Sequence, residues 1–174
     1  MILGNYYKSM GALMLCGETP IAVKDIHGSE RIFKQSITSY IQSIANEVLG
    51  FGKLGVVSTA KANKSSVYFG TGTTPPTLED YFLSGDVISG ISYNSAQDYT
   101  VDSDGSVKRT VLYTVTNSNE TDITIGEIGY VGYLNGSPGC YCMVERTVLD
   151  SPVTIPAGGV GQITYTIRMN YPTA

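Results

Sequence analysis

The chain has 174 residues, of which 11 are Lys or Arg and 15 are Asp or Glu, so its formal net charge is −4 and only 15% of its residues are charged. A protein that binds nucleic acid by neutralising phosphates needs clustered cations, and this balance argues against that class. Hydrophobic residues make up 42% of the chain and the mean hydropathy is +0.03, which fits neither a disordered nor a membrane protein. The 20 Gly and 13 Tyr, with no Trp and a single His, favour a β-rich scaffold with many turns.

The N-terminal segment, residues 1–62, is the least regular part of the chain. Apolar residues recur at helical spacing from Ile37 to Val48, with Ser36 as a candidate N-cap and Gly50 at the C-terminal stop. The pattern predicts one short helix, although a β-rich context could pull the same residues into irregular structure. The apolar run Gly11–Cys16 is too short for a signal peptide or a membrane span, so we expect a chain made in the cytoplasm and not exported through a cleaved signal.

The central part of the chain is predicted to turn tightly and then to form a hairpin. Asp104 and Gly105 make the strongest short hairpin signal in the sequence. Within the second strand of this hairpin, Val111, Tyr113 and Val115 share one face. The predicted elements are, in order, a buried strand at Val67–Phe69, a turn at Gly70–Pro76, a short helix or turn at 78–83, and paired strands at Gln97–Asp102 and Val107–Thr116.

The C-terminal part predicts further short strands separated by turns. The last strand, Gly161–Tyr171, alternates apolar and polar residues along its whole length, which is typical of a half-buried antiparallel strand. The elements before it are a polar turn at Asn117–Asp122, strands at Ile123–Ile125 and Glu127–Leu134, a turn at Asn135–Gly139, a strand at Cys140–Leu149, an extended piece at Val153–Ile155 between Pro152 and Pro156, and a turn at Ala157–Gly159.

This spacing of strands and turns predicts an all-β, mainly antiparallel fold of the β-sandwich or jelly-roll type. A chain of 18.6 kDa can bury about 69% of its extended surface, enough for a core. We expect a single domain over residues 1–174, in which residues 1–62 pack on the sandwich or contact neighbouring subunits.

No pattern of residues predicts a catalytic site. His27 lies in the polar loop Asp25–Ser29, where an exposed histidine is the commoner outcome than a catalytic base, and no nucleophile elbow is present. Glu127 and Glu145 lie on strands that could be neighbours, but paired carboxylates on a wet sheet face are ordinary, and there is no Trp to hold a sugar. We therefore expect no catalytic residues.

Metal and cofactor sites are not predicted either. Cys16, Cys140 and Cys142 are odd in number and are interpreted as reduced structural residues, with a metal site or a strained or inter-chain disulfide as the alternatives. Asp102–Gly105 lacks two anchors of a calcium loop and is interpreted as a plain turn. Gly70–Gly72 lacks the third glycine and the following Lys of a phosphate cradle, so a tight turn explains it.

Two further biases have structural explanations. Gly126, Gly129 and Gly132 recur every three residues, which on a strand indicates bulges or close approach of another backbone. The excess of 13 Tyr over 4 Phe favours a wet protein interface, where Tyr covers area at low entropic cost, but it is equally typical of a protein rich in strands.

Several segments of the C-terminal part carry distinctive runs. They are Tyr68–Tyr81 with the run GTGTTPP, Arg109–Asn117, Ile123–Gly129 with its Glu-Ile-Gly step, and Val144–Gly158 with the run VLDSPVTIPAG. These segments resemble a group of tailed-bacteriophage and prophage virion proteins, and the resemblance covers the chain from Val67 onwards. It implies a small β-sandwich that serves as a building block of the head, vertex, neck or tail, with no catalytic residues.

Composition and resemblance lead to the same expectation. We expect a non-enzymatic virion structural protein that binds itself and other capsid, neck or tail proteins, without nucleic acid, membrane, metal or cofactor. The alternative is a receptor- or carbohydrate-binding module of a phage fibre. That module would need a concave site lined by several of Tyr93, Tyr99, Tyr130, Tyr133 and Tyr141.

Overall fold

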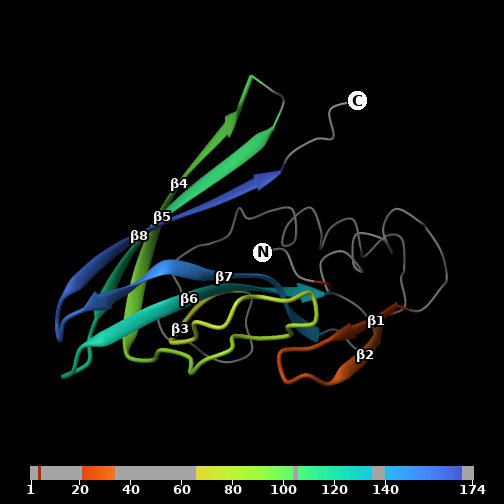
Figure 1. Ribbon diagram of the computed structural model, residues 1–174, viewed down its shortest axis with the longest axis horizontal. Coiled ribbons are helices and arrows are strands. Elements are labelled where there is room, and N and C mark those ends of the chain that lie inside the picture. The colour runs from red at the N-terminus through yellow and green to blue at the C-terminus, as the bar shows by residue number, and fades with distance from the viewer. Residues whose placement is uncertain (1–3, 5–20, 34–65, 104–105, 135–139, 170–174) are drawn as a thin grey trace. The chain divides into compact units, whose positions relative to one another are not determined.

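A computed structural model describes residues 4, 21–33, 66–103, 106–134 and 140–169 (Figure 1). Its strands are β1 (Ile21–Lys24), β2 (Glu30–Phe33), β3 (Ser66–Gly70), β4 (Ile91–Val101), β5 (Val107–Asn117), β6 (Ile123–Leu134), β7 (Cys140–Ile155) and β8 (Val160–Met169). Each pairing with a defined register is antiparallel. The prediction of an all-β, mainly antiparallel fold is confirmed, whereas the helix predicted between Ser36 and Gly50 lies outside the described residues.

The described residues form two compact units. Unit 1 holds residues 4, 21–33, 66–89, 124–134 and 140–153, with the β1–β2 hairpin and a sheet in the order β3-β6-β7. Unit 2 holds residues 90–103, 106–123 and 154–169, with a sheet in the order β4-β5-β8. The packing of both sheets into one β-sandwich domain stays a prediction.

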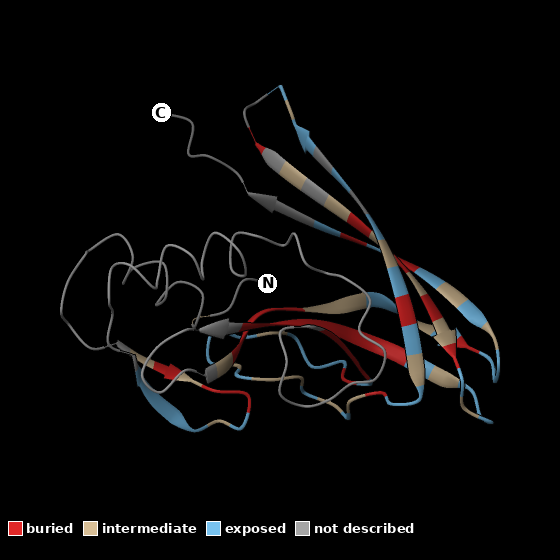
Figure 2. Cartoon of the chain, turned by 180° about the vertical axis from the view of Figure 1, so that it is seen from behind, coloured by how far each residue is buried: buried red, intermediate tan, exposed pale blue. Residues whose placement is uncertain are grey.

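The sheet of unit 1 is buried on both faces along much of its length. Figure 2 colours most of β6 and the first part of β7 as buried. A core cluster of Ile26, Tyr68, Val131 and Met143 is extended by partly buried hydrophobic residues, among them Leu83. Strand β3 confirms the prediction at Val67–Phe69, and β6 is one strand where two pieces were expected.

The hairpin β1–β2 was not predicted from the sequence. Its register pairs Ile21 with Phe33 and Lys24 with Glu30. The connecting turn includes Gly28 at φ 76°, a conformation that glycine adopts without strain. Two strands alone are marginally stable, and Ile26, in the turn, joins the core cluster of unit 1.

Unit 2 contains the predicted hairpin. Strands β4 and β5 pair from Ile91–Asn117 to Val101–Val107, so the first strand is longer than expected, and β8 pairs along the other edge of β5. Burial alternates with a period of two residues, as predicted. Val111, Tyr113 and Val115 are buried on β5 between half-buried residues, and Ile163 and Tyr165 are buried on β8 between exposed ones. A period of two residues is the expected pattern for a sheet with one buried face.

Strand β7 continues through Pro152 to Ile155, so the break expected between Cys140–Leu149 and Val153–Ile155 is absent. Strand β7 lies at the edge of the β3-β6-β7 sheet, where a residue without an N–H group is tolerated. The predicted turn at Ala157–Gly159 is confirmed, because Gly159 N–H donates to Pro156 O over 2.8 Å and Gly158 has φ 67°.

The buried side chain of Asn117 joins the 117–122 turn to the start of the β7–β8 connection. Its Nδ2 atom donates to the carbonyl oxygens of Thr121, Ile155 and Pro156 at 2.9, 3.1 and 3.0 Å. Its Oδ1 atom accepts from the Asn119 N–H and Nδ2 at 3.0 and 2.9 Å. A single amide therefore satisfies several backbone groups that the ladders leave unpaired.

Candidate functional site

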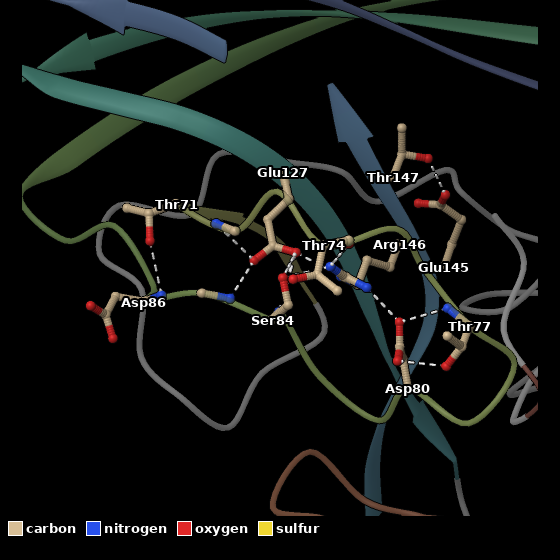
Figure 3. A network of polar contacts seen from close by, with 12 residues as sticks. Thr71, Thr74, Thr77, Asp80, Ser84, Asp86, Glu127, Glu145, Arg146 and Thr147 are labelled. Carbon is tan, nitrogen blue, oxygen red and sulfur yellow. Dashed lines mark hydrogen bonds and ion pairs between the residues drawn. The ribbon is translucent and has the colours of Figure 1, made fainter. Parts of the chain in front are cut away.

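The most elaborate polar arrangement among the described residues is a buried cluster in unit 1 (Figure 3). We call it the clasp. It joins Glu127 on β6 and Arg146 on β7 to the loop that follows β3, and its members are Gly72, Thr74, Asp80, Ser84, Gly85, Glu127 and Arg146. The side chains of Glu127 and Arg146 are 0% and 1% exposed.

Hydrogen-bond donors surround both carboxylate oxygens of Glu127. The N–H groups of Gly72 and Gly85 donate to Oε1 at 3.2 and 2.7 Å. Oε2 accepts from the N–H and hydroxyl of Ser84, each at 3.2 Å, and from Arg146 Nε at 2.6 Å. Burial alone would raise the pKa of Glu127, but these hydrogen bonds and the guanidinium charge outweigh it and hold the pKa below its ordinary value.

Arg146 connects Glu127 to the far end of the loop. Its Nη1 atom donates to Asp80 Oδ2, and its Nη2 atom donates to Thr74 O and Ser84 Oγ, each at 2.6 Å. One planar guanidinium thus donates to several loop groups at once. Arginine suits this role better than lysine, because its donors are fixed in a planar fork.

Asp80 also closes the turn at its own end of the loop. It accepts from the Thr77 N–H at 2.9 Å and from the Thr77 hydroxyl at 2.8 Å, and its own N–H donates to Thr77 O at 3.3 Å. Desolvation alone would raise the pKa of Asp80. The hydrogen bonds from Thr77 and Arg146 have the larger combined effect, so the pKa lies below its ordinary value. The predicted segment at 78–83 is therefore a turn.

Glycines let the loop reach the sheet. A Cβ atom on Gly126 would lie 2.6 Å from Gly72 O and 2.9 Å from Thr71 O. A Cβ on Gly72 would overlap the Glu127 carboxylate. The tight turn expected at Gly70–Gly72 is absent, because Gly70 ends β3 and residues 71–73 form no turn. The Gly72 N–H instead donates to an anion, the chain's own Glu127.

The expectation for Glu127 and Glu145 was wrong, because neither lies on a wet face. Both are buried, and Glu145 accepts from the Thr147 hydroxyl at 2.7 Å. Successive residues of a strand point to opposite faces, so Glu145 points away from the face where its neighbour Arg146 meets Glu127. In Figure 3 the two carboxylates lie apart from each other.

His27 is an exposed residue of the loop between β1 and β2, as predicted. The loop is closed by Asp25, whose Oδ1 accepts from the N–H groups of His27 and Ser29, each at 2.9 Å. Its Oδ2 accepts from Arg31 Nε at 2.8 Å. Burial raises the pKa of Asp25, but these bonds, led by that from Arg31, bring it below its ordinary value.

The expected cysteine and calcium features are only partly described. Cys142 is a buried cysteine, while Cys16 and the side chain of Cys140 lie outside the described residues. Asp102 N–H donates to Ser106 O at 2.9 Å, as in a turn, and residues 104–105 are not described. Within the described ranges, no group of three or more His, Cys, Asp and Glu could hold a metal ion.

Most described tyrosines contribute to the cores of the two units. Tyr93 and Tyr113 are buried in unit 2 and meet edge to face, with ring centroids 5.7 Å apart. Tyr130 is buried in unit 1 and Tyr141 is half-buried, while the side chains of Tyr99 and Tyr133 are outside the description. These positions match the interpretation of tyrosine as a strand-forming core residue.

Sequence reasoning missed Arg146 altogether. The available signal was the adjacent pair Glu145-Arg146 directly after the apolar run Cys142–Val144, because charges within a buried strand must be paired. Its partners could not be read from the sequence, since Glu127 and Asp80 are 19 and 66 residues away.

Comparison with models of known protein families, with curated proteins and with solved structures finds no match for this chain. In the part of the chain that the structure describes, no helix is both long and apolar enough to cross a membrane.

The clasp is built to hold the loop rather than to transfer protons. Glu127 is kept ionised by donors on both oxygens, and the Arg146 guanidinium does not release its proton. Its chemical role is therefore to bind the chain's own loop to β6 and β7.

Proposed function

We propose that this chain is a non-enzymatic structural protein of a tailed-bacteriophage or prophage virion. In this proposal it assembles with itself and with other proteins of the head, neck or tail. The resemblance of its motifs to virion proteins is the starting point, and the arrangement of those motifs in the fold supports it.

The observation that carries the proposal is that three of the resembling segments meet in the clasp. Tyr68–Tyr81 supplies Gly72, Thr74 and Asp80. Ile123–Gly129 supplies Glu127, and Val144–Gly158 supplies Arg146. Residues from three separate motifs thus hold one loop against the sheet, which is a structural role.

The fourth resembling segment has a structural role as well. Arg109–Asn117 ends in the buried Asn117, which binds carbonyl oxygens of Ile155 and Pro156 in the last motif. The alternative of a ligand-binding module is disfavoured because Tyr93 and Tyr130, two of its expected wall residues, are buried.

The test is the presence of the chain in virus particles. Particles purified on a density gradient from cells that produce this chain are expected to contain it in a constant ratio to the major capsid protein, measured by quantitative mass spectrometry. Its absence from intact particles would overturn the proposal.

The non-enzymatic part has its own test. A His27→Ala variant should support particle formation at the wild-type yield, because His27 is the single histidine and is an exposed loop residue. The matched control is Ser29→Ala in the same loop. A folded His27→Ala variant that yields no particles, while Ser29→Ala does, would contradict a purely structural role.

A further inference from the structure

We propose that one face of the β4-β5-β8 sheet is a docking surface for a second copy of this chain. The inference rests on the proposed function and deepens it by naming a surface through which copies meet. We call this surface the open face. It consists of Ser92, Asn94, Ala96, Asp98 and Thr100 on β4, Lys108, Thr110, Leu112, Thr114 and Thr116 on β5, and Val160, Gln162, Thr164 and Thr166 on β8.

The open face is accessible, and its charged residues Asp98 and Lys108 lie toward the end of the sheet where β4 ends and β5 begins. Its described residues are exposed on β4 and β8 and half-buried on β5, while the opposite face carries the buried Tyr93, Tyr113 and Ile163. Between Ser92 and Asp98 on β4, and at the positions paired with them, Asp98 is the sole charged residue. Depletion of charge and short side chains of low entropy are typical of the centre of an interface.

The register arranges the open face in rows across the sheet. The central row is Ala96, Leu112 and Thr164, which offers methyl groups. On one side lies an amide-bearing row of Asn94, Thr114 and Gln162. On the other lies an acceptor row of Asp98, Thr110 and Thr166, in which the two threonine hydroxyl oxygens are 3.4 Å apart.

These rows are complementary to themselves when a second copy is placed face to face. A two-fold axis that crosses the strands at Leu112 reverses the order of the rows, so each amide row faces the acceptor row of the other copy. Asn94 then lies over the partner's Asp98 and Gln162 over the partner's Thr166, each an amide donor facing an oxygen acceptor. A two-fold contact requires this reciprocity.

Charge selects this axis over the other face-to-face choice. An axis parallel to the strands would keep the row order and set Lys108 over the partner's Lys108, and like charges directly opposite each other are unfavourable. With the axis across the strands, Lys108 instead faces the partner's Thr116. Leu112 meets the partner's Leu112 at the centre of the contact.

The area of the open face indicates that two copies bind each other weakly in solution and more strongly where many copies are held together. Three strands about 4.8 Å apart and about nine residues long cover about 450 Å² on each copy, or about 900 Å² in total. Specific interfaces begin at about 1,000 Å², so a dissociation constant of about 10–100 μM is expected in solution. In a particle with many copies, simultaneous contacts would raise the effective affinity.

Sedimentation velocity of the full chain over a dilution series tests the proposal. The wild type should show a concentration-dependent monomer–dimer equilibrium. Leu112→Lys and Leu112→Asp should each weaken dimerisation at least about tenfold, because each places like charges at the axis. An equal mixture of the two variants should regain dimer, because the introduced lysine of one copy then faces the introduced aspartate of the other.

Matched controls separate this contact from a general effect of charge. Thr121→Lys and Thr121→Asp add the same charges at an exposed position in the 117–122 turn of the same unit and should dimerise like the wild type. Far-ultraviolet circular dichroism checks that each variant is folded. If a Leu112 variant does not fold, Thr114→Asp replaces it. The new carboxylate on the amide row would face the partner's acceptor row with Asp98, so the same tenfold weakening is expected.

The results that overturn the proposal are distinct from those that overturn the proposed function. A wild type that stays monomeric up to about 500 μM, well above the expected dissociation constant, overturns it. A folded Leu112→Lys variant that dimerises like the wild type, or a mixture no tighter than either variant alone, also overturns it. Such a chain could still be found in particles, whereas a dimer absent from particles contradicts the proposed function alone.

Discussion

Arg146 Nε donates a 2.6 Å hydrogen bond to Glu127 Oε2, and the two side chains are 1% and 0% exposed. Removing two charges from water costs energy that their attraction repays only when the remaining donors and acceptors are satisfied. Here they are satisfied by the loop, through Asp80, Ser84 and backbone groups of Gly72 and Gly85. The pair therefore specifies where the loop lies.

Removing the arginine is expected to be strongly destabilising. Arg146→Ala would leave Glu127 buried without its cation, and the free energy of unfolding should fall by about 3–5 kcal/mol. The double variant Arg146→Met/Glu127→Leu should cost less than Arg146→Ala, because no buried charge is stranded. Urea unfolding followed by circular dichroism measures both.

The control for this prediction is Arg31→Ala, in the more exposed pair with Asp25. With Arg31 at 45% exposure, its loss should cost no more than about 1 kcal/mol. If Arg31→Ala and Arg146→Ala lower the free energy of unfolding equally, the clasp contributes no more to stability than the exposed ion pair does.

Stability should depend on pH through the clasp carboxylates. Glu127 and Asp80 have pKa values below the ordinary 4.5 and 3.8, so the unfolded chain binds more protons than the folded chain when the pH falls into this range. Their contribution is complete above about pH 5, and it is lost as the pH falls through these ordinary values toward the folded-state values.

The measurement is the free energy of urea unfolding between pH 7 and pH 3. It should be flat from pH 7 to about pH 5 and then fall, and a folded Glu127→Gln variant should show a shallower fall. The exposed Glu79→Gln change serves as the control and should leave the profile unchanged. A wild-type stability that rises below pH 5 would contradict the assignment.

Gly126 should not tolerate a side chain. In Gly126→Ala the new Cβ would lie 2.6 Å from Gly72 O, a backbone atom that cannot move without shifting the loop. We expect a loss of about 1–3 kcal/mol. Gly132→Ala on the same strand is the matched control, because the nearest atoms there are side-chain carbons at 3.9 Å.

Thermal unfolding of the two alanine variants compares these sites directly. Gly132→Ala should unfold at or slightly above the wild-type temperature, since alanine reduces the entropy of the unfolded chain. If Gly126→Ala unfolds at the same temperature as Gly132→Ala, the loop does not approach β6 as described.

Asn117 should be needed for the stability of unit 2. Asn117→Ala would remove the side-chain donor from the buried carbonyl group of Ile155 and one of the two donors to the Pro156 carbonyl group, and we expect a loss of about 2 kcal/mol by urea unfolding. Ser118→Ala, one residue further and exposed, should change stability by less than about 0.5 kcal/mol. A loss of the same size at Ser118 would argue against the role given to Asn117.

Strands β5 and β8 of unit 2 and the faces they bury could be predicted from the sequence, whereas the first half of β4 could not. Val111, Tyr113 and Val115 alternate with polar residues, and a strand turns successive side chains to opposite faces whatever the rest of the chain does. A second local rule, the preference of Asp-Gly pairs for hairpin turns, predicted that β4 pairs with β5. Local rules also predicted the Ala157–Gly159 turn, where Gly158 adopts φ 67°.

Tertiary structure alone decided the fate of the charged residues in unit 1. Glu127 and Glu145 were expected on a wet face because a strand pattern does not say what covers the sheet. The loop from Thr71 to Asp86 covers Glu127 through the N–H groups of Gly72 and Gly85, 55 and 42 residues away in the sequence. Periodicity is a property of neighbouring residues, whereas the burial of a charge depends on partners that only the folded chain brings within reach.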